Sequence, residues 1–355
     1  MNVDAFLTKM VELGGSDAHL KVGSPPGVRI AGKIVPQGTV PLRPEHTETI
    51  ARTLLNEQQW EVFAEQNDID CSHSIPGVSR FRVNIMRQRG SISLVLRRIP
   101  EKIPSFADLG LPEVCKTLAL KPRGLVLVTG PTGSGKSTTL AAMIDYINEN
   151  EQGHILTMED PIEFMHADKK CFVNQREIGS DTKDFTQALR RALRQDPDVI
   201  LIGEMRDLET ISLAVTAAET GHLVFGTLHT SSAIKTVDRI VNVFPPEQQA
   251  QIRMQLAGTL QGVISQTLLP KIGGGRVAAL EILVAIDAVR AMIREGKTPQ
   301  MLTAMQTGAK FGMSLLEEHL NRLIAAKQIT VEDAIAKANM PQLIKRPGGQ
   351  PVVEE

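Results

Sequence analysis

A glycine-rich stretch near the middle of the chain carries the residue types that hold a phosphate chain. It fits the pattern G-x-x-x-x-G-K-[ST] in full and lies between an apolar run and the start of a predicted helix. Glycines in such a turn let backbone N–H groups curl around phosphate oxygens. Lys136 is expected to reach the β- and γ-phosphates, and Ser137 to ligate Mg²⁺. An ordinary glycine-rich turn is the alternative, but the strand–loop–helix context favours an ATP-binding loop made by Gly130, Pro131, Thr132, Gly133, Ser134, Gly135, Lys136, Ser137 and Thr138.

An acidic turn, Glu159-Asp160-Pro161-Ile162-Glu163, follows the predicted strand 154–158. Sheets of alternating strands and helices place ligands at the C-terminal edge of the strands. Hydrolysis of a triphosphate needs a carboxylate that orients and deprotonates a water in line with the γ-phosphate. Glu159 and Glu163, projecting from a turn held by Pro161, are candidates for this work; a solvated acidic turn is the alternative.

A second acidic segment, Gly203-Glu204-Met205-Arg206-Asp207, follows the apolar strand 199–202. P-loop enzymes generally end the corresponding strand in an aspartate that serves Mg²⁺. Here that position is Gly203 and the acid is Glu204. We therefore expect waters held by Glu204, or another acid, to complete the magnesium shell that begins with Ser137.

Two histidines, His222 and His229, bracket the predicted strand 223–227. With no cysteine or third histidine nearby, a zinc site is disfavoured. The functional interpretation is a polar contact to the γ-phosphate region or to a neighbouring subunit, and a structural role for each histidine remains open.

Arginines cluster in two places. Six lie in the last strands of the N-terminal region, and Arg190 and Arg194 are four apart on a predicted helix 184–194 and should share a face. Most such arginines are plain surface. One or two could act in trans on a neighbour's phosphates, which requires an oligomer; the candidates we select are Arg82, Arg97 and Arg194.

The elements that must position these residues fall into two groups. Before Pro100 the pattern predicts a small α+β domain, with a helix at 2–13, a strand at 16–22, a hairpin at 28–35, one or two helices at 44–63 and strands over 70–99. Beyond Pro112 strands alternate with helices, which is typical of a mainly parallel sheet: strands at 125–129, 154–158, 199–202, 223–227 and 278–283, a helix at 137–148, and helical structure over 285–340. We predict domains at 1–99 and 113–345, a proline-rich linker at 100–112 and a disordered tail at 346–355.

Composition narrows the possible functions. The chain has 355 residues, 42% hydrophobic and 22% charged, which indicates a globular protein of about two domains. The net charge of -1 and the 3% of aromatic residues argue against bulk polyanion binding and base stacking, so no nucleic-acid partner is expected. Three separated cysteines without a C-x-x-C pair indicate reduced thiols in a cytosol. No apolar run has transmembrane length and the first residues do not form a signal peptide, so we expect membrane association only through a partner.

The chain resembles the type II/IV secretion ATPase superfamily in four motifs that occur in the same order. They are the phosphate loop, the E-D-P-x-E box, the D-x-x-x-x-G-E-x-R-D box and the G-H-L-V-F-G-T-L-H-T box. The similarity runs from Gly14 to Met313 and is greatest to the retraction ATPases of type IV pili. Extension and secretion ATPases usually carry an extra N-terminal domain and a four-cysteine zinc module, neither of which is seen in this sequence. Retraction ATPases also carry A-I-R-N-L-I-R-E, which here reads A-V-R-A-M-I-R-E over 288–295, with Ala291 in place of the asparagine.

The resemblance implies a homo-hexameric ring whose subunits have a PAS-like N-terminal domain and a RecA-like C-terminal domain, with ATP between them. Hydrolysis would drive pilus disassembly, at the inner face of the cell membrane, through an inner-membrane platform protein and with a paralogous ATPase as a possible partner. In the family the general base is the last glutamate of the acidic box, here Glu163, and Glu204, His222 and His229 are the other box residues. In the helix over 288–295 we expect Val289, Met292 and Ile293 to face a core and Arg290 and Arg294 to face solvent.

The sequence leaves three alternatives to a main retraction ATPase. Ala291 leaves an accessory retraction ATPase possible. The RecA-type core is also compatible with a nucleic-acid translocase, although the charge gives no support. A regulatory module that binds a nucleotide without hydrolysing it is disfavoured, because the acidic segments around Glu163 and Glu204 are typical of hydrolysis.

Overall fold

The computed structural model describes residues 1–100 and 102–346. The chain divides into two compact units, the first formed by Met1–Lys102 with Glu163–Met165, and the second by the rest. The fold is α/β, with a RecA-like P-loop unit preceded by a smaller α+β unit. The tail that we predict to be disordered lies, from residue 347 onward, outside the described residues.

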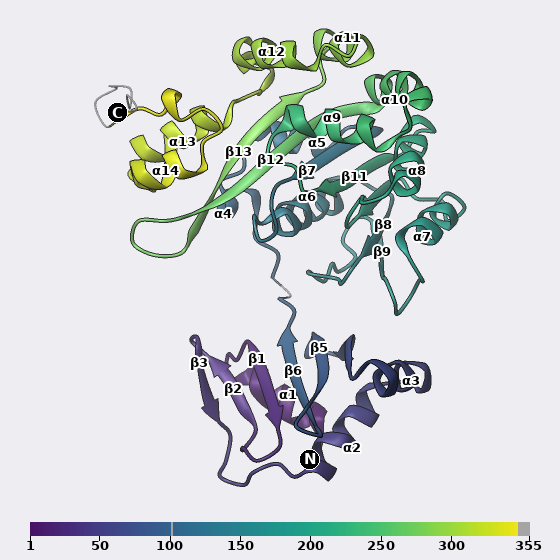
Figure 1. The fold of residues 1–355 in the computed structure, drawn as a ribbon, viewed down its shortest axis with the longest axis vertical. Helices are drawn as coiled ribbons and strands as arrows, with labels where there is room; N and C mark the ends of the chain where they lie inside the picture. Colours follow the sequence, from purple (N-terminus) through teal and green to yellow (C-terminus); the bar gives the residue numbers. More distant parts are fainter. Residues whose placement is uncertain (101, 347–355) are drawn as a thin grey trace. The chain divides into compact units, whose positions relative to one another are not determined.

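The first unit is built on a six-stranded antiparallel sheet in the order β3-β2-β1-β6-β5-β4 (Figure 1). Alternate residues of β5 such as Phe81, Val83 and Ile85 are fully buried and pack with the apolar faces of the helices, as period-two patterning predicts. The strands are β1 (Asp17–Lys21), β2 (Gly27–Ile30), β3 (Lys33–Pro36), β4 (Asp68–Ile75), β5 (Ser79–Gln88) and β6 (Ser91–Arg98), and the helices are α1 (Val3–Glu12), α2 (Pro44–Leu54) and α3 (Glu57–Gln66).

The second unit is built on a seven-stranded sheet in the order β13-β12-β7-β11-β10-β8-β9. The strands from β12 to β9 run parallel, and β13 closes one edge as an antiparallel hairpin with β12. The strands are β7 (Gly124–Thr129), β8 (His154–Glu159), β9 (Phe172–Glu177), β10 (Val199–Ile202), β11 (Leu223–Leu228), β12 (Leu260–Pro270) and β13 (Arg276–Val284). Every residue of β7, β10 and β11 is buried, as expected for a parallel sheet covered on both faces.

Helices cover both faces of this sheet (Figure 1). On β7, Leu125 and Leu127 face one layer, while Val126 and Val128 face the other. The layers are made by α4 (Phe106–Leu109), α5 (Glu113–Ala119) and α6 (Lys136–Asn150) on one side and by α7 (Phe185–Ala192), α8 (Leu208–Glu219), α9 (Ala233–Val243) and α10 (Pro246–Thr259) on the other. The C-terminal helices are α11 (Asp287–Arg294), α12 (Met301–Thr307), α13 (Leu316–Ala325) and α14 (Val331–Lys337). None of the helices in the described ranges has both the length and the apolar character needed to cross a bilayer.

Several local predictions were wrong or incomplete. Strands β9 and β12 were not predicted, because β9 is polar and lies at a sheet edge while β12 follows directly on a helix. Helix α7 ends at Ala192, four residues before Asp196, which precedes a proline and has φ +53°. Arg194 therefore lies past the helix and shares no face with Arg190. Phe106, inside the predicted linker, is buried against Tyr146 in the core of the second unit.

The prediction that Arg290 faces solvent was also wrong. Its Nη1 donates hydrogen bonds to the carbonyls of Ala257 (2.7 Å) and Gly258 (3.1 Å), at the end of α10. The last carbonyls of a helix have no partner within the helix, so a cation that reaches them is stabilising. Val289 and Ile293 are buried as expected.

A buried acid joins the hairpin β12–β13 to the helices around it. Glu281 of β13 accepts hydrogen bonds from the backbone N–H of Ala233 (2.6 Å), at the start of α9, and from Nδ2 of Asn339 (3.2 Å). Burial raises the pKa of Glu281 to about 7; the nearby Glu317 carboxylate adds to the rise, and the Ala233 N–H, Asn339 and Lys235 oppose it.

We expect Glu281 to make stability depend on pH. The pKa of Glu281 in the folded chain lies above its ordinary value of 4.5, so between pH 4.5 and about 7 this carboxyl group stays protonated in the folded state but ionises in the unfolded state. The free energy of unfolding therefore falls as the pH rises from 4.5 to about 7. The slope is at most about 1.4 kcal/mol per pH unit. Glu281→Gln should therefore lose less stability than wild type between pH 5 and pH 8 in urea titrations. The control is Glu332→Gln, at an exposed acid of α14; equal slopes for wild type and Glu281→Gln would contradict the prediction.

Candidate nucleotide-binding site

The predicted phosphate loop joins β7 to α6 at the C-terminal edge of the parallel strands. Gly130, Gly133 and Gly135 have φ of +142°, +76° and +88°, a region that side chains disfavour. At Gly130 a Cβ would also lie 2.1 Å from the carbonyl oxygen of Gln266 on β12. The loop therefore has the positive-φ backbone of an anion cradle and is tightly backed by a neighbouring strand.

Lys136 is the first residue of α6 and lies over the loop. Its Nζ donates hydrogen bonds to the carbonyl oxygens of Gly130 (2.9 Å) and Pro131 (3.1 Å). Burial lowers the pKa of Lys136, and the negative charge of Glu204 partly opposes this. Ser137, next along the helix, is exposed at its N-terminal end, where the helix dipole favours negative charge.

Glu204, two residues past β10, is held by two partners. Its Oε1 lies 2.6 Å from Nε of Arg206 and 2.8 Å from Nε2 of His229. Burial by itself raises the pKa of Glu204, but the hydrogen bonds and charges of Arg206 and His229 outweigh it and hold the pKa below its ordinary range. Glu204 is therefore ionised at neutral pH, and its negative charge acts on Lys136.

The two predicted histidines are separated by the strand between them. His229 follows the C-terminal end of β11 and contacts Glu204. His222 precedes its N-terminal end, about 20 Å away for a six-residue strand, and its Nδ1 contacts the carbonyl oxygen of Ala217 (2.9 Å) in α8. Of the two histidines, the structure thus brings His229 to Glu204, while His222 contacts the end of α8.

The acidic turn is fixed by a residue that sequence analysis missed. Glu177, buried at the end of β9, accepts a hydrogen bond from the backbone N–H of Ile162 (3.1 Å). Glu159 accepts hydrogen bonds from Thr157 Oγ1 (2.7 Å) and from Gln175 Nε2 (3.2 Å), so its carboxylate is held by residues of the sheet. Of the two glutamates that we proposed for work on water, Glu163 is the exposed one.

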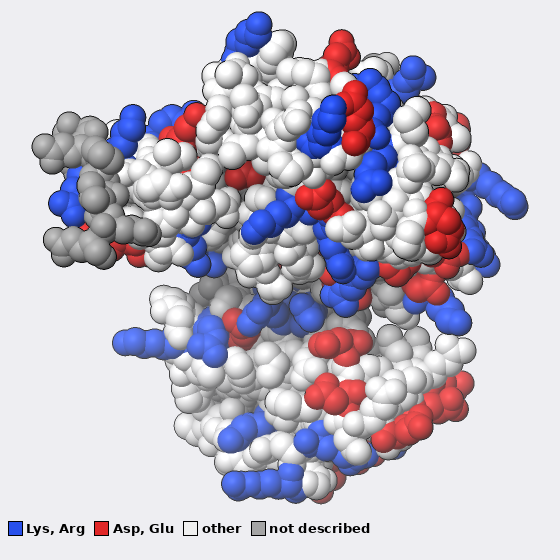
Figure 2. Space-filling model, turned by 45° about the horizontal axis from the view of Figure 1, so that its top comes forward, with Lys and Arg blue, Asp and Glu red and all other residues white. Residues whose placement is uncertain are grey.

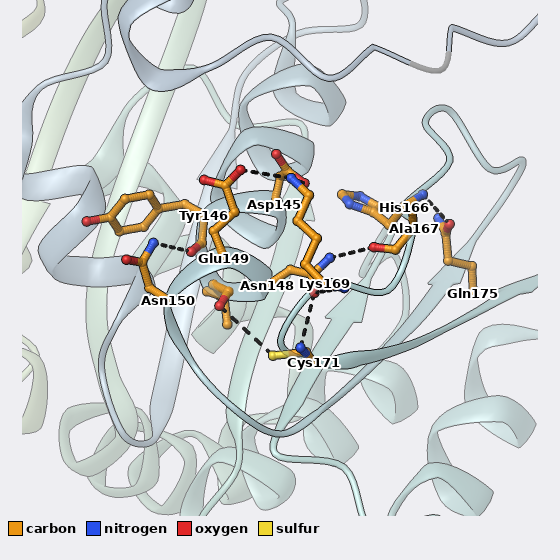
Figure 3. A network of polar contacts seen from close by, with 11 residues as sticks. Asp145, Tyr146, Asn148, Glu149, Asn150, His166, Ala167, Lys169, Cys171 and Gln175 are labelled. Carbon is orange, nitrogen blue, oxygen red and sulfur yellow. Dashed lines mark hydrogen bonds and ion pairs between the residues drawn. The ribbon is translucent and has the colours of Figure 1, made fainter.

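The chain that returns from the acidic turn is pinned to the end of α6 (Figure 3). The buried Asn148 side chain makes three hydrogen bonds to backbone groups: Nδ2 donates to the Ala167 carbonyl (2.8 Å), and Oδ1 accepts from the N–H groups of Lys169 (3.1 Å) and Cys171 (3.2 Å). Lys169 Nζ adds ion pairs to Asp145 (2.7 Å) and Glu149 (2.9 Å). The helix that begins with Lys136 therefore also anchors the segment that follows Glu163.

Two of the three proposed trans-acting arginines belong to the first unit and one to the second. Arg82 and Arg97 are directly opposite each other on β5 and β6 of the first unit. Nε of Arg97 lies 2.8 Å from Oδ1 of the buried Asp17, and Arg82 is exposed. Arg194 is exposed in the turn after α7. Their role at a neighbour's site stays a prediction.

The donor set suits magnesium held mainly by phosphate and water. Among the described residues no three or more His, Cys, Asp or Glu side chains gather where they could hold a metal ion. Mg²⁺ keeps several waters and is usually bound by one or two carboxylates together with substrate phosphates. The Ser137 hydroxyl, next to Lys136 in the chain, and the Glu204 carboxylate, whose charge acts on Lys136, fit that requirement.

These features define the class: a RecA-like P-loop nucleotide-binding protein. Residues 68–346 match the family "Type II/IV secretion system protein", and the chain belongs to this family. It is 53% identical to the type IV pilus retraction ATPase PilT of Pseudomonas aeruginosa, over 96% of this chain and 99% of that protein. It is 43% identical to the type IV pilus ATPase PilU of the same organism, over 96% and 89%.

Solved structures agree with this assignment. A crystal structure of the pilus retraction motor PilT with bound ADP superposes with a TM-score of 0.87 at 49% identity, covering 96% of this chain and 98% of that one. The ATPase DotB of Legionella pneumophila gives a TM-score of 0.84 at 30% identity, over 95% and 96%.

We expect the Asn148 anchor to be important for stability. Asn148→Ala removes three hydrogen bonds to backbone groups, of which the one from the Cys171 N–H is buried, and each lost bond costs about 1 kcal/mol. The melting temperature should fall and proteolysis within residues 160–171 should accelerate. The matched control is Asn150→Ala, which removes one exposed hydrogen bond to the Tyr146 carbonyl on the same helix. Equal effects of the two substitutions would show that Asn148 is no special anchor.

Proposed function

We propose that this chain is the ATP-hydrolysing motor that retracts type IV pili. The observation that carries the proposal is the combination of the phosphate loop and the ionised Glu204 beside it in a chain that matches the retraction ATPase PilT at 53% identity over nearly its whole length. Adenosine triphosphate is the substrate and Mg²⁺ its partner ion.

The residues have distinct parts in hydrolysis. The positive-φ loop and the N-terminus of α6 bind the phosphate oxygens through backbone N–H groups. Lys136, which lies over that loop, provides its charge to the β- and γ-phosphates. Ser137 and Glu204 hold Mg²⁺, directly or through water, and the ion neutralises phosphate charge. Glu163 accepts the proton of the attacking water.

The assembly is a homo-hexamer in which arginines of one subunit complete the site of the next. Arg82 and Arg97 are the first candidates, because they lie side by side on one strand pair and, within residues 1–100 and 102–346, Asp17 is the one acid seen to contact Arg97. Nucleotide binding favours one arrangement of the two units over another, with the hinge within residues 100–112. The motor acts in the cytoplasm at the inner face of the cell membrane, bound to a platform protein and, in some states, to a paralogous ATPase.

Glu163→Gln should bind ATP with wild-type affinity and hydrolyse it at least 100-fold more slowly, because an amide cannot accept the proton of water. Phosphate release and equilibrium ATP binding measure the two effects. In cells that carry this variant, surface pili should accumulate and twitching motility should be lost. The matched control is Glu151→Gln, at an exposed acid after α6. Near-wild-type turnover by Glu163→Gln would remove Glu163 from the role of base; absent pili would indicate an extension motor.

Trans-acting arginines predict complementation between inactive subunits. Arg97→Ala and Glu163→Gln should each be inactive alone, yet a mixture should recover part of the activity, because some interfaces then combine an intact arginine with an intact Glu163. The specific activity should also rise with protein concentration. Arg276→Ala, at the exposed first residue of β13, is the control. A mixture as inactive as its components would contradict the in-trans role.

An accessory retraction ATPase is the second candidate, because Ala291 replaces the asparagine of the retraction motif and the chain is 43% identical to PilU. Deletion of the gene separates the two: a main motor is needed for all retraction, while an accessory one is needed only in part. A nucleic-acid translocase has less support, since both units carry acidic as well as basic side chains on the face seen in Figure 2. Salt-dependent stimulation of ATP hydrolysis by DNA would favour it.

A further inference from the structure

Gln266 is a buried polar residue on β12 that no sequence motif indicates. It is 4% exposed and lies next to the phosphate loop, where its own carbonyl oxygen would lie 2.1 Å from a Cβ on Gly130. Its side-chain Nε2 would lie 2.8 Å from a Cβ on Gly135. Backbone and side chain of this one residue therefore fill the space behind both ends of the loop.

The side chain of Gln266 bonds to the loop and to the helix at once. Nε2 donates a hydrogen bond to the carbonyl oxygen of Ser134 (2.7 Å), and Oε1 accepts one from Oγ1 of Thr139 (2.8 Å). A carbonyl oxygen can only accept, so the amide nitrogen must face Ser134, and the amide oxygen then faces the Thr139 hydroxyl. All three groups belong to buried residues, so the contacts are shielded from competing water.

The direction of the Ser134 carbonyl matters for phosphate binding. A peptide group carries its C=O and the next residue's N–H on opposite sides. Holding the Ser134 carbonyl toward Gln266 therefore directs the Gly135 N–H the other way, toward the inside of the loop. A positive φ at Gly133 and at Gly135 allows this orientation, and the Gln266 amide holds it.

We propose that Gln266 is a positioning residue for nucleotide binding: it holds the phosphate loop, through Ser134 and Thr139, in the conformation that accepts phosphate. It touches no substrate in this role. The proposal rests on nucleotide binding at this loop, which is part of the proposed function. A loop already in its binding conformation pays less ordering entropy when the ligand arrives.

The test compares two substitutions on the same strand. Gln266→Met keeps the length of the side chain and removes both hydrogen bonds. The matched control is Gln261→Met near the start of β12, which removes the bond from Gln261 Nε2 to the Arg123 carbonyl (3.0 Å) and the bond from Arg290 Nη2 to Gln261 Oε1 (3.4 Å). Affinities for ADP and ATP with Mg²⁺, the steady-state kcat and KM, and the melting temperature with and without ADP are measured for both assembled variants.

The expected result separates positioning from general stability. Both variants should melt at a lower temperature than wild type, but only Gln266→Met should bind ADP and ATP about tenfold more weakly, with KM raised and kcat changed little, because the loop contacts both nucleotides alike. The rise in melting temperature on adding ADP should shrink in Gln266→Met alone. Unchanged nucleotide affinity in Gln266→Met, or equal weakening in both variants, overturns the proposal.

Two further variants keep the test decisive if Gln266→Met does not fold. Gln266→Glu retains an acceptor for Thr139 but no donor for Ser134, so it should also weaken ADP binding. Thr139→Val should weaken ADP binding less than Gln266→Glu does. The effects of the two substitutions on the free energy of ADP binding should not add, because both disturb the same hydrogen-bonded set of Thr139, Gln266 and Ser134. Full additivity, or normal binding in both, contradicts the role. Failure of the wild-type chain to bind nucleotide would instead overturn the proposed function.

Discussion

Backbone N–H groups can bind phosphate only if several of them point to one spot, and that requirement is the constraint behind the second unit. The loop after β7 meets it with glycines at positive φ, at positions where two Cβ atoms would collide with Gln266. Such a backbone is costly to maintain on its own. The strand β12 behind the loop and the helix α6 after it supply the support, so the loop depends on elements that are distant in sequence.

The acidic residues around the loop follow from the same parallel sheet. Strands β7, β11, β10 and β8 are neighbours, so the segments that follow their C-terminal ends converge. Glu204 remains ionised there because Arg206 and His229 contact it. The acidic turn is held at one side by Glu177 and at the other by Asn148. Each chemical group is thus placed by a buried polar contact from another part of the chain.

The hairpin β12–β13 links two of these supports. Gln266 on β12 contacts the phosphate loop, while Glu281 on the neighbouring strand contacts the first N–H of α9, shortly after His229. Both are buried hydrogen-bonding groups, which are costly to leave unpaired. The C-terminal helices pack on the same hairpin, through Leu269 and Ala279.

The sequence by itself determined the local features: period-two strands, the two kinds of unit, the phosphate loop and the acidic and histidine boxes, all readable within short windows. It failed where a partner is far away. Arg290 was assigned to the surface because helical periodicity shows only which residues share a face of their own helix. The carbonyl oxygens that Arg290 caps belong to the end of another helix. Gln266, Asn148 and Glu177 carry no motif, because their partners lie on other elements. Only the tertiary structure decided these contacts, since spatial adjacency between strands and helices is not encoded in any single stretch of residues.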